Sequence, residues 1–167
     1  MIQVLASQSI KFSPDYFIAK AGIEKLRKEF CSTFFEQVPT HGDPVPSNFM
    51  ILADQLMLFD WEYSGLNDPA WDLAFLSCVM DYPEKLDHQL MKFYKGADFE
   101  MLYAKMIFFK PIVEFWLGLW GLSQTVAHTS YAEKEFFRYF AISRFRKSQK
   151  YQTSEAMKKG LELLHET

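Results

Sequence analysis

Apolar residues recur along most of this chain every three or four positions, a period that predicts α-helices. Ser13-Pro14 marks the first start, because serine caps helices and proline suits the first helical turn. Pro111 should kink or split the longest helix. The expected helices cover residues 14 to the mid-thirties, 69–81, 84–95, 98–127, 131–149 and 153–165.

The period changes between the first two helices. Two short apolar runs, NFMIL and LMLFDWE, flank Ala53-Asp54-Gln55 and predict a β-hairpin. Turn residues enclose the hairpin, with HGDPVPSN (41–48) before it and the stretch from Gly65 to Pro69 after it. The pattern therefore predicts a mainly α fold with one small β-hairpin, organised as a single domain over residues 1–167.

Composition narrows the classes of protein. With 167 residues and 49% apolar composition, the chain has the size of one globular core. A net charge of -3 gives no reason to expect nucleic acid or an anionic membrane surface as a partner. Cys31 and Cys78 lack C-x-x-C spacing, which suits reduced thiols in the cytoplasm. Lys110 and Glu114 interrupt the most apolar stretch, so no membrane span is expected.

The loop HGDPVPSN gathers hydrogen-bonding side chains where neither a helix nor a central strand can form. Asp43 and Asn48 can converge there, and the hairpin should return Asp60 close to Asn48. Their oxygen atoms would suit Mg²⁺. His41, Asp43 and Asn48 also have the spacing of the kinase catalytic loop, which a metal-binding aspartate follows. From spacing alone, a capped turn with Asx hydrogen bonds and a satisfied histidine stays open as the alternative.

A longer match adds to this spacing. The run LMLFDWEYSGLNDPAWDLA (56–74), placed behind HGDPVPSN, resembles the second signature of the choline/ethanolamine kinase family, which is related to aminoglycoside phosphotransferases. The resemblance implies the C-terminal lobe of a protein-kinase-like fold. It also implies an ATP- and Mg²⁺-dependent phosphotransferase. Its implied site residues are Asp43 as catalytic base, His41 as the residue that fixes the catalytic loop, Asn48 and Asp60 as magnesium and nucleotide-phosphate ligands, and Asp72 as a buried brace.

The late helices extend the resemblance to the acceptor pocket. FWLGLWGLSQ and TSYAEKEFFRYF resemble the family segments that line the choline site, which implicates Trp120, Tyr131 and Tyr63. Trp116 lies four residues before Trp120 on the same helix face, but eukaryotic members usually carry the first tryptophan at the position of Leu117. Aromatic faces bind quaternary ammonium groups through cation–π attraction. Without the resemblance, an aromatic stripe at helical spacing is more often part of a packed core than of a cage.

The acceptor and its negative partner stay open. Glu62, Asp81 or Asp43 itself could face the cation. A choline-like amino alcohol is the expected substrate, while ethanolamine, thiamine or an aminoglycoside would keep the chemistry and change the acceptor.

The resemblance covers one half of the family's enzyme. The 40 residues ahead of HGDPVPSN contain no glycine-rich loop and no strand-borne lysine that could hold ATP. We therefore expect the N-terminal nucleotide-binding lobe to be absent from residues 1–167, and the chain alone to be weakly active or inactive. It would associate with a separate N-terminal lobe or form a homodimer. The alternative is a non-catalytic remnant that binds a ligand or a partner without phosphate transfer.

Overall fold

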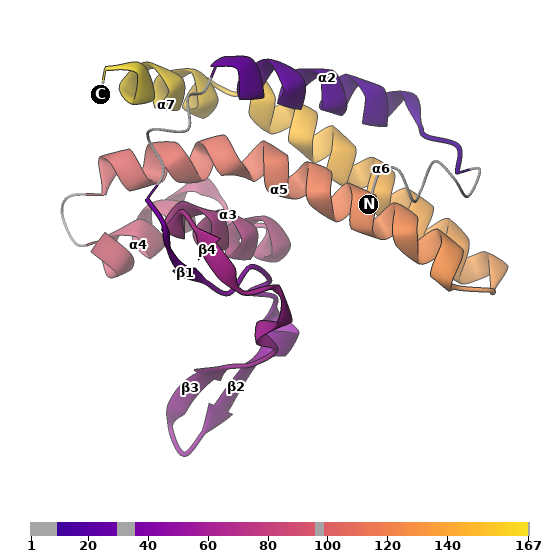
Figure 1. Cartoon of the computed structure of the whole chain (residues 1–167), viewed down its shortest axis with the longest axis horizontal. Coiled ribbons are helices and arrows are strands. Elements are labelled where there is room, and N and C mark those ends of the chain that lie inside the picture. The colour runs from indigo at the N-terminus through magenta and orange to yellow at the C-terminus, as the bar shows by residue number, and fades with distance from the viewer. Residues whose placement is uncertain (1–9, 30–35, 96–98, 167) are drawn as a thin grey trace. The chain divides into compact units, whose positions relative to one another are not determined.

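The computed structural model describes residues 10–29, 36–95 and 99–166 and is mainly helical (Figure 1). The predicted helices after residue 69 are confirmed to within three residues at their ends. The first begins at Pro14 as predicted, and the part expected beyond residue 29 lies outside the described residues. The helices are α2 (Pro14–Glu29), α3 (Pro69–Met80), α4 (Glu84–Lys95), α5 (Glu100–Ala127), α6 (Tyr131–Gln152) and α7 (Glu155–His165).

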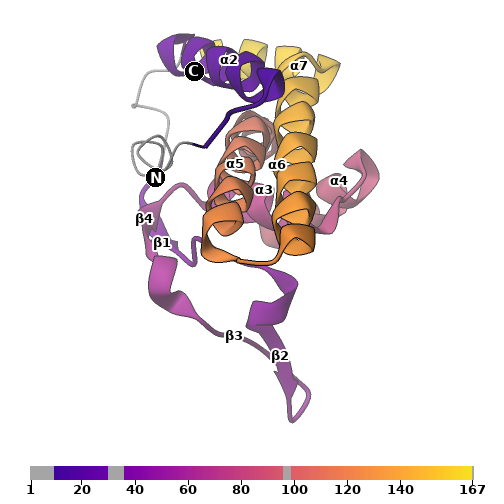
Figure 2. The same cartoon turned by 90° about the vertical axis from the view of Figure 1, so that its right-hand side faces the viewer.

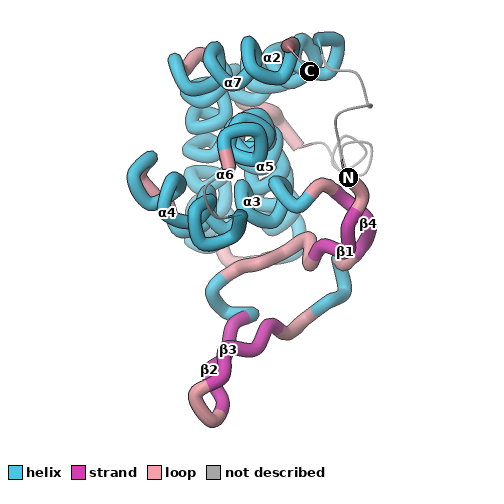
Figure 3. The backbone as a smooth tube through the Cα atoms, turned by 90° about the vertical axis from the view of Figure 1, so that its left-hand side faces the viewer, coloured by secondary structure: helices cyan, strands magenta, loops and turns pink. Residues whose placement is uncertain are grey.

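The predicted hairpin is confirmed. Strand β2 (Phe49–Leu52) pairs antiparallel with β3 (Gln55–Leu58), and Ala53 and Asp54 make the turn with positive φ angles (Figure 2). A second antiparallel pair, β1 (Val38–Thr40) with β4 (Gly65–Asn67), was not predicted (Figure 3). Each of these strands has three residues, which is too short for an alternating pattern to be recognised.

The chain forms two compact units, and each unit combines segments that are far apart in the sequence. The first unit contains α2, the part of α5 from Pro111 onward, and α6. The second unit contains the strands, α3, α4, the part of α5 up to Lys110, and α7.

Aromatic rings make the core of the first unit. Tyr16 of α2 is stacked on Phe115 of α5 with ring centroids 5.6 Å apart, and it meets Phe145 of α6 edge-on at 5.5 Å. Gly118 allows this packing, because a Cβ atom there would lie 2.4 Å from the Phe145 ring. Side chains of α6 also hold α2 in place, since the Gln149 amide donates to the Asp15 carbonyl over 2.9 Å.

The second unit has an apolar core that encloses ion pairs. Phe75 and Cys78 of α3 are fully buried. Lys110 of α5 pairs with Asp87 of α4, which also accepts a hydrogen bond of 2.5 Å from Ser77. All three polar groups are buried, and the Asp87 carboxylate is the shared partner of Lys110 and Ser77.

Helix α5 continues through Pro111, so the predicted split does not occur. By length and composition it is the one helix among the described residues that could cross a membrane, but 78% of its most apolar window is buried in the structure. Lys105 and Lys110 lie within it, and both make buried ion pairs. These properties are those of a core helix.

Candidate functional site

The loop that follows β1 is held by one carboxylate of α3. Asp72 accepts hydrogen bonds from the backbone N–H groups of His41 and Gly42, over 2.6 and 2.9 Å. Gly42 has a φ angle of +83°, and a Cβ atom there would lie 2.4 Å from the Tyr63 carbonyl oxygen. The loop therefore needs glycine at this position, and Asp72, which is half-buried, fixes its start.

His41 is buried and uses both ring nitrogens within this loop. Its Nδ1 accepts from the Asp43 N–H over 3.2 Å, which leaves Nε2 protonated to donate to the Phe59 carbonyl over 2.6 Å. The Trp61 ring meets the imidazole edge-on at 4.8 Å. His41 thus ties the loop to the end of the hairpin, and neither nitrogen is left for a metal ion.

Asn48 and Asp43 are brought together by a 3₁₀ turn, Pro46–Asn48. The Asn48 Nδ2 donates to the Asp43 carbonyl over 3.0 Å and lies 3.5 Å from the Asp43 Oδ2. The Phe59 N–H donates to the Asn48 carbonyl over 2.8 Å, which extends the hairpin pairing by one residue pair. Asp60 comes directly after that pair, two residues beyond the end of β3, in the left-handed conformation.

Opposing influences act on the pKa of the Asp43 carboxyl. Burial raises its pKa above the ordinary value of 3.8, and the charges of Asp60 and Glu62 act in the same direction. His41 and the hydrogen bond from Asn48 act in the opposite direction but are outweighed. A half-buried carboxylate with a raised pKa accepts a proton more readily than an exposed one.

The chemistry of the loop fits a magnesium ion. The Asn48 amide nitrogen is turned to Asp43, so its oxygen faces away and can serve as a ligand. Asp60 offers a carboxylate, and it directly follows Phe59, the residue whose N–H bonds the Asn48 carbonyl. The described residues contain no group of three or more His, Cys, Asp or Glu side chains arranged to hold a metal. Magnesium is often bound by only one or two protein ligands together with substrate phosphates and water.

The predicted acceptor residues fall in both units. In the second unit, Glu62 and Tyr63 lie in the exposed 3₁₀ turn Trp61–Tyr63, and the Glu62 charge raises the pKa of the Tyr63 hydroxyl. In the first unit, Trp120 meets the rings of Phe137 and Phe140 edge-on, each at 5.8 Å. Trp120 therefore packs partly as a core residue.

The other two aromatic residues differ in exposure. Trp116 is half-buried, and Tyr131 at the start of α6 is 78% exposed. Asp81, the alternative negative partner, is exposed at the end of α3 in the left-handed conformation.

Sequence reasoning missed a second brace behind the loop. Asp68 caps α3 by accepting from the Ala70 N–H over 3.0 Å, and it forms a buried ion pair of 3.0 Å with Lys105. It also accepts from the Glu36 N–H over 3.0 Å, so it ties the segment before β1 to α3 and α5. The Asp68-Pro69 pair was a detectable helix-start signal, but its ion-pair partner lies 37 residues away.

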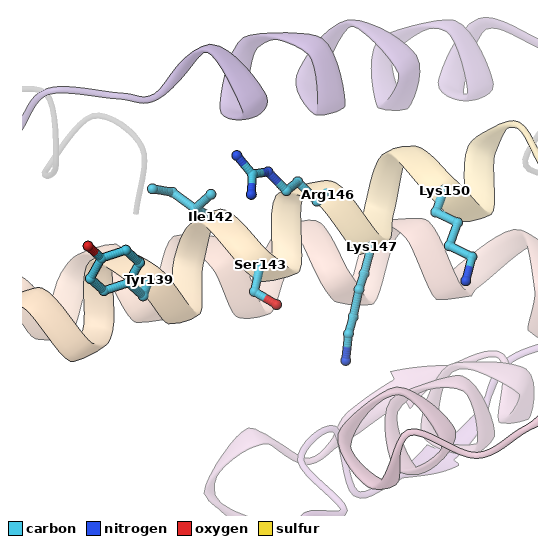
Figure 4. A pocket seen from close by; sticks show the side chains of 6 residues that line it. All are labelled: Tyr139, Ile142, Ser143, Arg146, Lys147 and Lys150. Atoms are coloured by element: carbon cyan, nitrogen blue, oxygen red, sulfur yellow. The ribbon is translucent and has the colours of Figure 1, made fainter.

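The basic stretch of α6 forms a separate hollow. Tyr139, Ile142, Ser143, Arg146, Lys147 and Lys150 line it along one helix, with a volume of about 390 Å³ (Figure 4). Arg146 turns toward α2 and pairs with Asp15 over 3.1 Å. None of the predicted site residues lines this hollow.

Comparison with known proteins places these observations in a family. The model of the phosphotransferase enzyme family matches residues 23–107, just over half of the chain. Protein LicA of Haemophilus influenzae is 39% identical over 66 residues, which are 35% of this chain and 24% of LicA. The chain thus spans about a quarter of that relative.

Solved structures share the fold over a longer stretch. A choline/ethanolamine kinase family protein from Mesorhizobium loti has a TM-score of 0.78 at 24% identity, covering 99% of this chain and 56% of that protein. Choline kinase LicA from Streptococcus pneumoniae has a TM-score of 0.68 at 22% identity, covering 86% of this chain and 52% of the other. A structure of LicA in complex with AMP has a TM-score of 0.73 at 23% identity, covering 90% and 52%.

Proposed function

The chain belongs to the phosphotransferase enzyme family, and from this premise we propose that it is the catalytic and acceptor-binding part of a choline kinase-like enzyme. In the proposed reaction, the hydroxyl of an amino alcohol attacks the γ-phosphorus of ATP. Asp43 takes the hydroxyl proton, the new oxygen–phosphorus bond forms, and the bond to the ADP oxygen breaks.

The geometry around Asp43 carries this proposal. The Asp43 N–H donates to the His41 ring, and the Asn48 amide donates to the Asp43 carbonyl. Burial raises the pKa of the Asp43 carboxyl. A positioned carboxylate of this kind suits a general base. Asn48 and Asp60 would hold Mg²⁺, which when bound neutralises phosphate charge during transfer.

The acceptor is proposed to be choline or a similar amino alcohol. The solved structures of similar fold include a protein of the choline/ethanolamine kinase family and a choline kinase. In the first unit, Trp116, Trp120 and Tyr131 would supply aromatic faces for the ammonium group. In the second unit, Tyr63 would supply a further aromatic face and Glu62 a negative charge. Ethanolamine, which has a primary ammonium group, is the nearest alternative acceptor.

Nucleotide binding is proposed to involve more than this chain. The chain spans 56% and 52% of the similar solved structures, so a comparable length of those proteins has no counterpart here. We propose that the missing part supplies groups that position the ATP phosphates, and that the complete enzyme works in the cytoplasm. Without such groups, a reaction that depends on positioning and electrostatics loses most of its rate.

An apolar surface on the hairpin supports a docking site for that missing lobe. Ile51 and Leu52 of β2 are 74% and 58% exposed, and Leu56 of β3, which pairs with Ile51, is 69% exposed. Exposed apolar side chains gathered on paired strands commonly mark an interface. We propose the nucleotide-binding lobe as its partner, and a homodimer is the competing outcome that sedimentation velocity would reveal.

The acceptor proposal can be tested by calorimetric titration of the purified chain with choline and, separately, with 3,3-dimethylbutan-1-ol. The second compound has the shape of choline without its charge. We expect choline to bind and the neutral compound to bind roughly two- to thirtyfold more weakly, because cation–π attraction is lost. Equal affinities would refute the aromatic cage. If choline does not bind, the acceptor proposal is refuted and the non-catalytic remnant is favoured.

The catalytic proposal needs a kinase assay with Asp43→Asn and, as a matched control, Asp54→Asn in the exposed hairpin turn. We expect little turnover from the chain alone and turnover when a nucleotide-binding lobe from a similar kinase is added. Asp43→Asn should abolish that turnover and Asp54→Asn should not. Full turnover of the chain alone would refute the need for a second lobe, and turnover that survives Asp43→Asn would refute the base.

A further inference from the structure

The second unit contains a cavity that the proposed phosphotransferase site does not use. It has a volume of about 460 Å³ and lies between α4, α5 and α7. Ala104, Ile107 and Leu163 give it an apolar base, and a Cβ atom added at Gly160 of α7 would be in ordinary van der Waals contact with Ala104. None of the predicted catalytic, metal or acceptor residues lines it.

An unsatisfied hydroxyl group lies at this cavity. The Tyr103 oxygen is buried and has no hydrogen-bond partner among the described residues. The ring of Tyr103 lies 4.3 Å from the His88 ring, which meets Phe99 edge-on at 5.8 Å. Buried hydroxyl groups normally have partners, so this hydroxyl is available for a hydrogen bond to an occupant of the cavity. The three rings form an aromatic wall beside it.

The charges around the cavity are mainly negative. Glu84 and Glu100 line it, and Lys159 is the one lysine among its lining residues. The charge of Lys159 also lowers the pKa of Glu155 on the same helix, α7, so part of the Lys159 charge is balanced there. Burial raises the pKa of the Tyr103 hydroxyl, and the charges of Glu84 and Asp87 raise it further. The cavity therefore disfavours an anionic occupant and favours a cation.

We propose that this cavity binds a small organic cation, a protonated amine with a short apolar body. The ammonium group would face Glu84 and Glu100 and donate a hydrogen bond to the Tyr103 oxygen, while the aromatic wall stabilises it by cation–π attraction. The apolar body would lie against the base of the cavity. This site is separate from the proposed acceptor site, because the two share no residue.

Calorimetric titration of the full chain with 2-phenylethylamine tests the proposal, with 2-phenylethanol as a neutral probe of the same shape. We expect the amine to bind and the alcohol to bind about tenfold more weakly, because the charged hydrogen bonds are lost. Equal affinity for the two probes, or no binding of the amine, would overturn the proposal. In the second case, the cavity holds only water.

Variants locate the binding site. Ala156→Leu should fill the cavity and prevent binding, while Tyr103→Phe and Glu84→Gln should each weaken it about tenfold. Asp54→Asn is the matched control, because it removes an exposed carboxylate in the hairpin turn that belongs to neither site, and it should leave amine binding unchanged. If Glu62→Gln prevents binding and Ala156→Leu does not, the amine occupies the acceptor site and the proposal is wrong. Tyr103→Phe preserves shape, so it remains informative if Ala156→Leu fails to fold.

Discussion

Replacing Asp72 with asparagine should loosen the loop that carries Asp43. The Asp72 carboxylate accepts the backbone N–H groups of His41 and Gly42 over 2.6 and 2.9 Å. Asparagine has nearly the same shape but only one acceptor oxygen. Its NH₂ group would therefore face one of the two N–H groups, so two donors would meet where a donor and an acceptor met before.

The size of the effect follows from this geometry. A hydrogen bond to a charged group contributes about 1.5–3 kcal/mol, and an unpaired buried donor costs about 1–3 kcal/mol. The remaining bond also loses the charge of its acceptor. Since these contributions overlap, we expect Asp72→Asn to lower the free energy of unfolding by roughly 2–4 kcal/mol. That is a large part of the stability of an ordinary domain.

Urea unfolding followed by circular dichroism measures the global effect, and hydrogen exchange at the His41 and Gly42 amides measures the local one. The control is Asp54→Asn, an exposed turn residue with a φ angle of 62° that asparagine also adopts readily. The control should change stability by less than about 0.5 kcal/mol. If Asp72→Asn behaves like the control and both amides remain equally protected, these hydrogen bonds do not hold the loop.

Three further predictions concern buried groups. Tyr103→Phe should raise the free energy of unfolding by about 1 kcal/mol, because it removes a buried hydroxyl that has no partner among the described residues. A loss of stability in urea unfolding would show that the hydroxyl is satisfied. Lys110→Met should cost about 3–5 kcal/mol, because it leaves the Asp87 charge buried, and adding Asp87→Leu should recover most of that loss. A double variant no more stable than Lys110→Met would contradict this. Burial raises the Asp43 pKa above 3.8 in the folded chain, so the native state binds the proton more tightly and Asp43 destabilises the fold as pH rises above 3.8. Asp43→Asn should therefore be more stable than the parent chain near neutral pH, and a difference in urea unfolding that persists below 3.8 would exclude this cause.

Local signals in the sequence were sufficient for most helices and for the hairpin. Asp68-Pro69 predicts the start of α3, and the turn at Ala53 and Asp54 separates two apolar runs. The β1–β4 pair could not be predicted, because it depends on the meeting of Thr40 with Gly65 across the loop and hairpin. Its strands carry no periodic pattern of their own.

The candidate site was predictable in part, because some of its contacts join residues that are close in the sequence. The spacing of Asp43 and Asn48 predicts convergence, and a short turn is sufficient to produce the observed hydrogen bond. The tautomer of His41 depends on the Phe59 carbonyl, which lies 18 residues away. The pairing of Asp68 with Lys105 depends on the packing of two helices. Such partners are fixed by tertiary structure, and spacing in the sequence does not specify them.

The interleaving of the two units has a consequence for synthesis. The chain passes between the units at residues 31–32, 110–111 and 154–155, so neither unit is one continuous segment. Because the first unit contains both α2 and α6, α2 cannot complete its unit until α6 has been made, after the whole first segment of the second unit. The second unit in turn waits for α7. Neither unit can therefore fold from one continuous stretch of chain, and neither can be released intact by a single proteolytic cut.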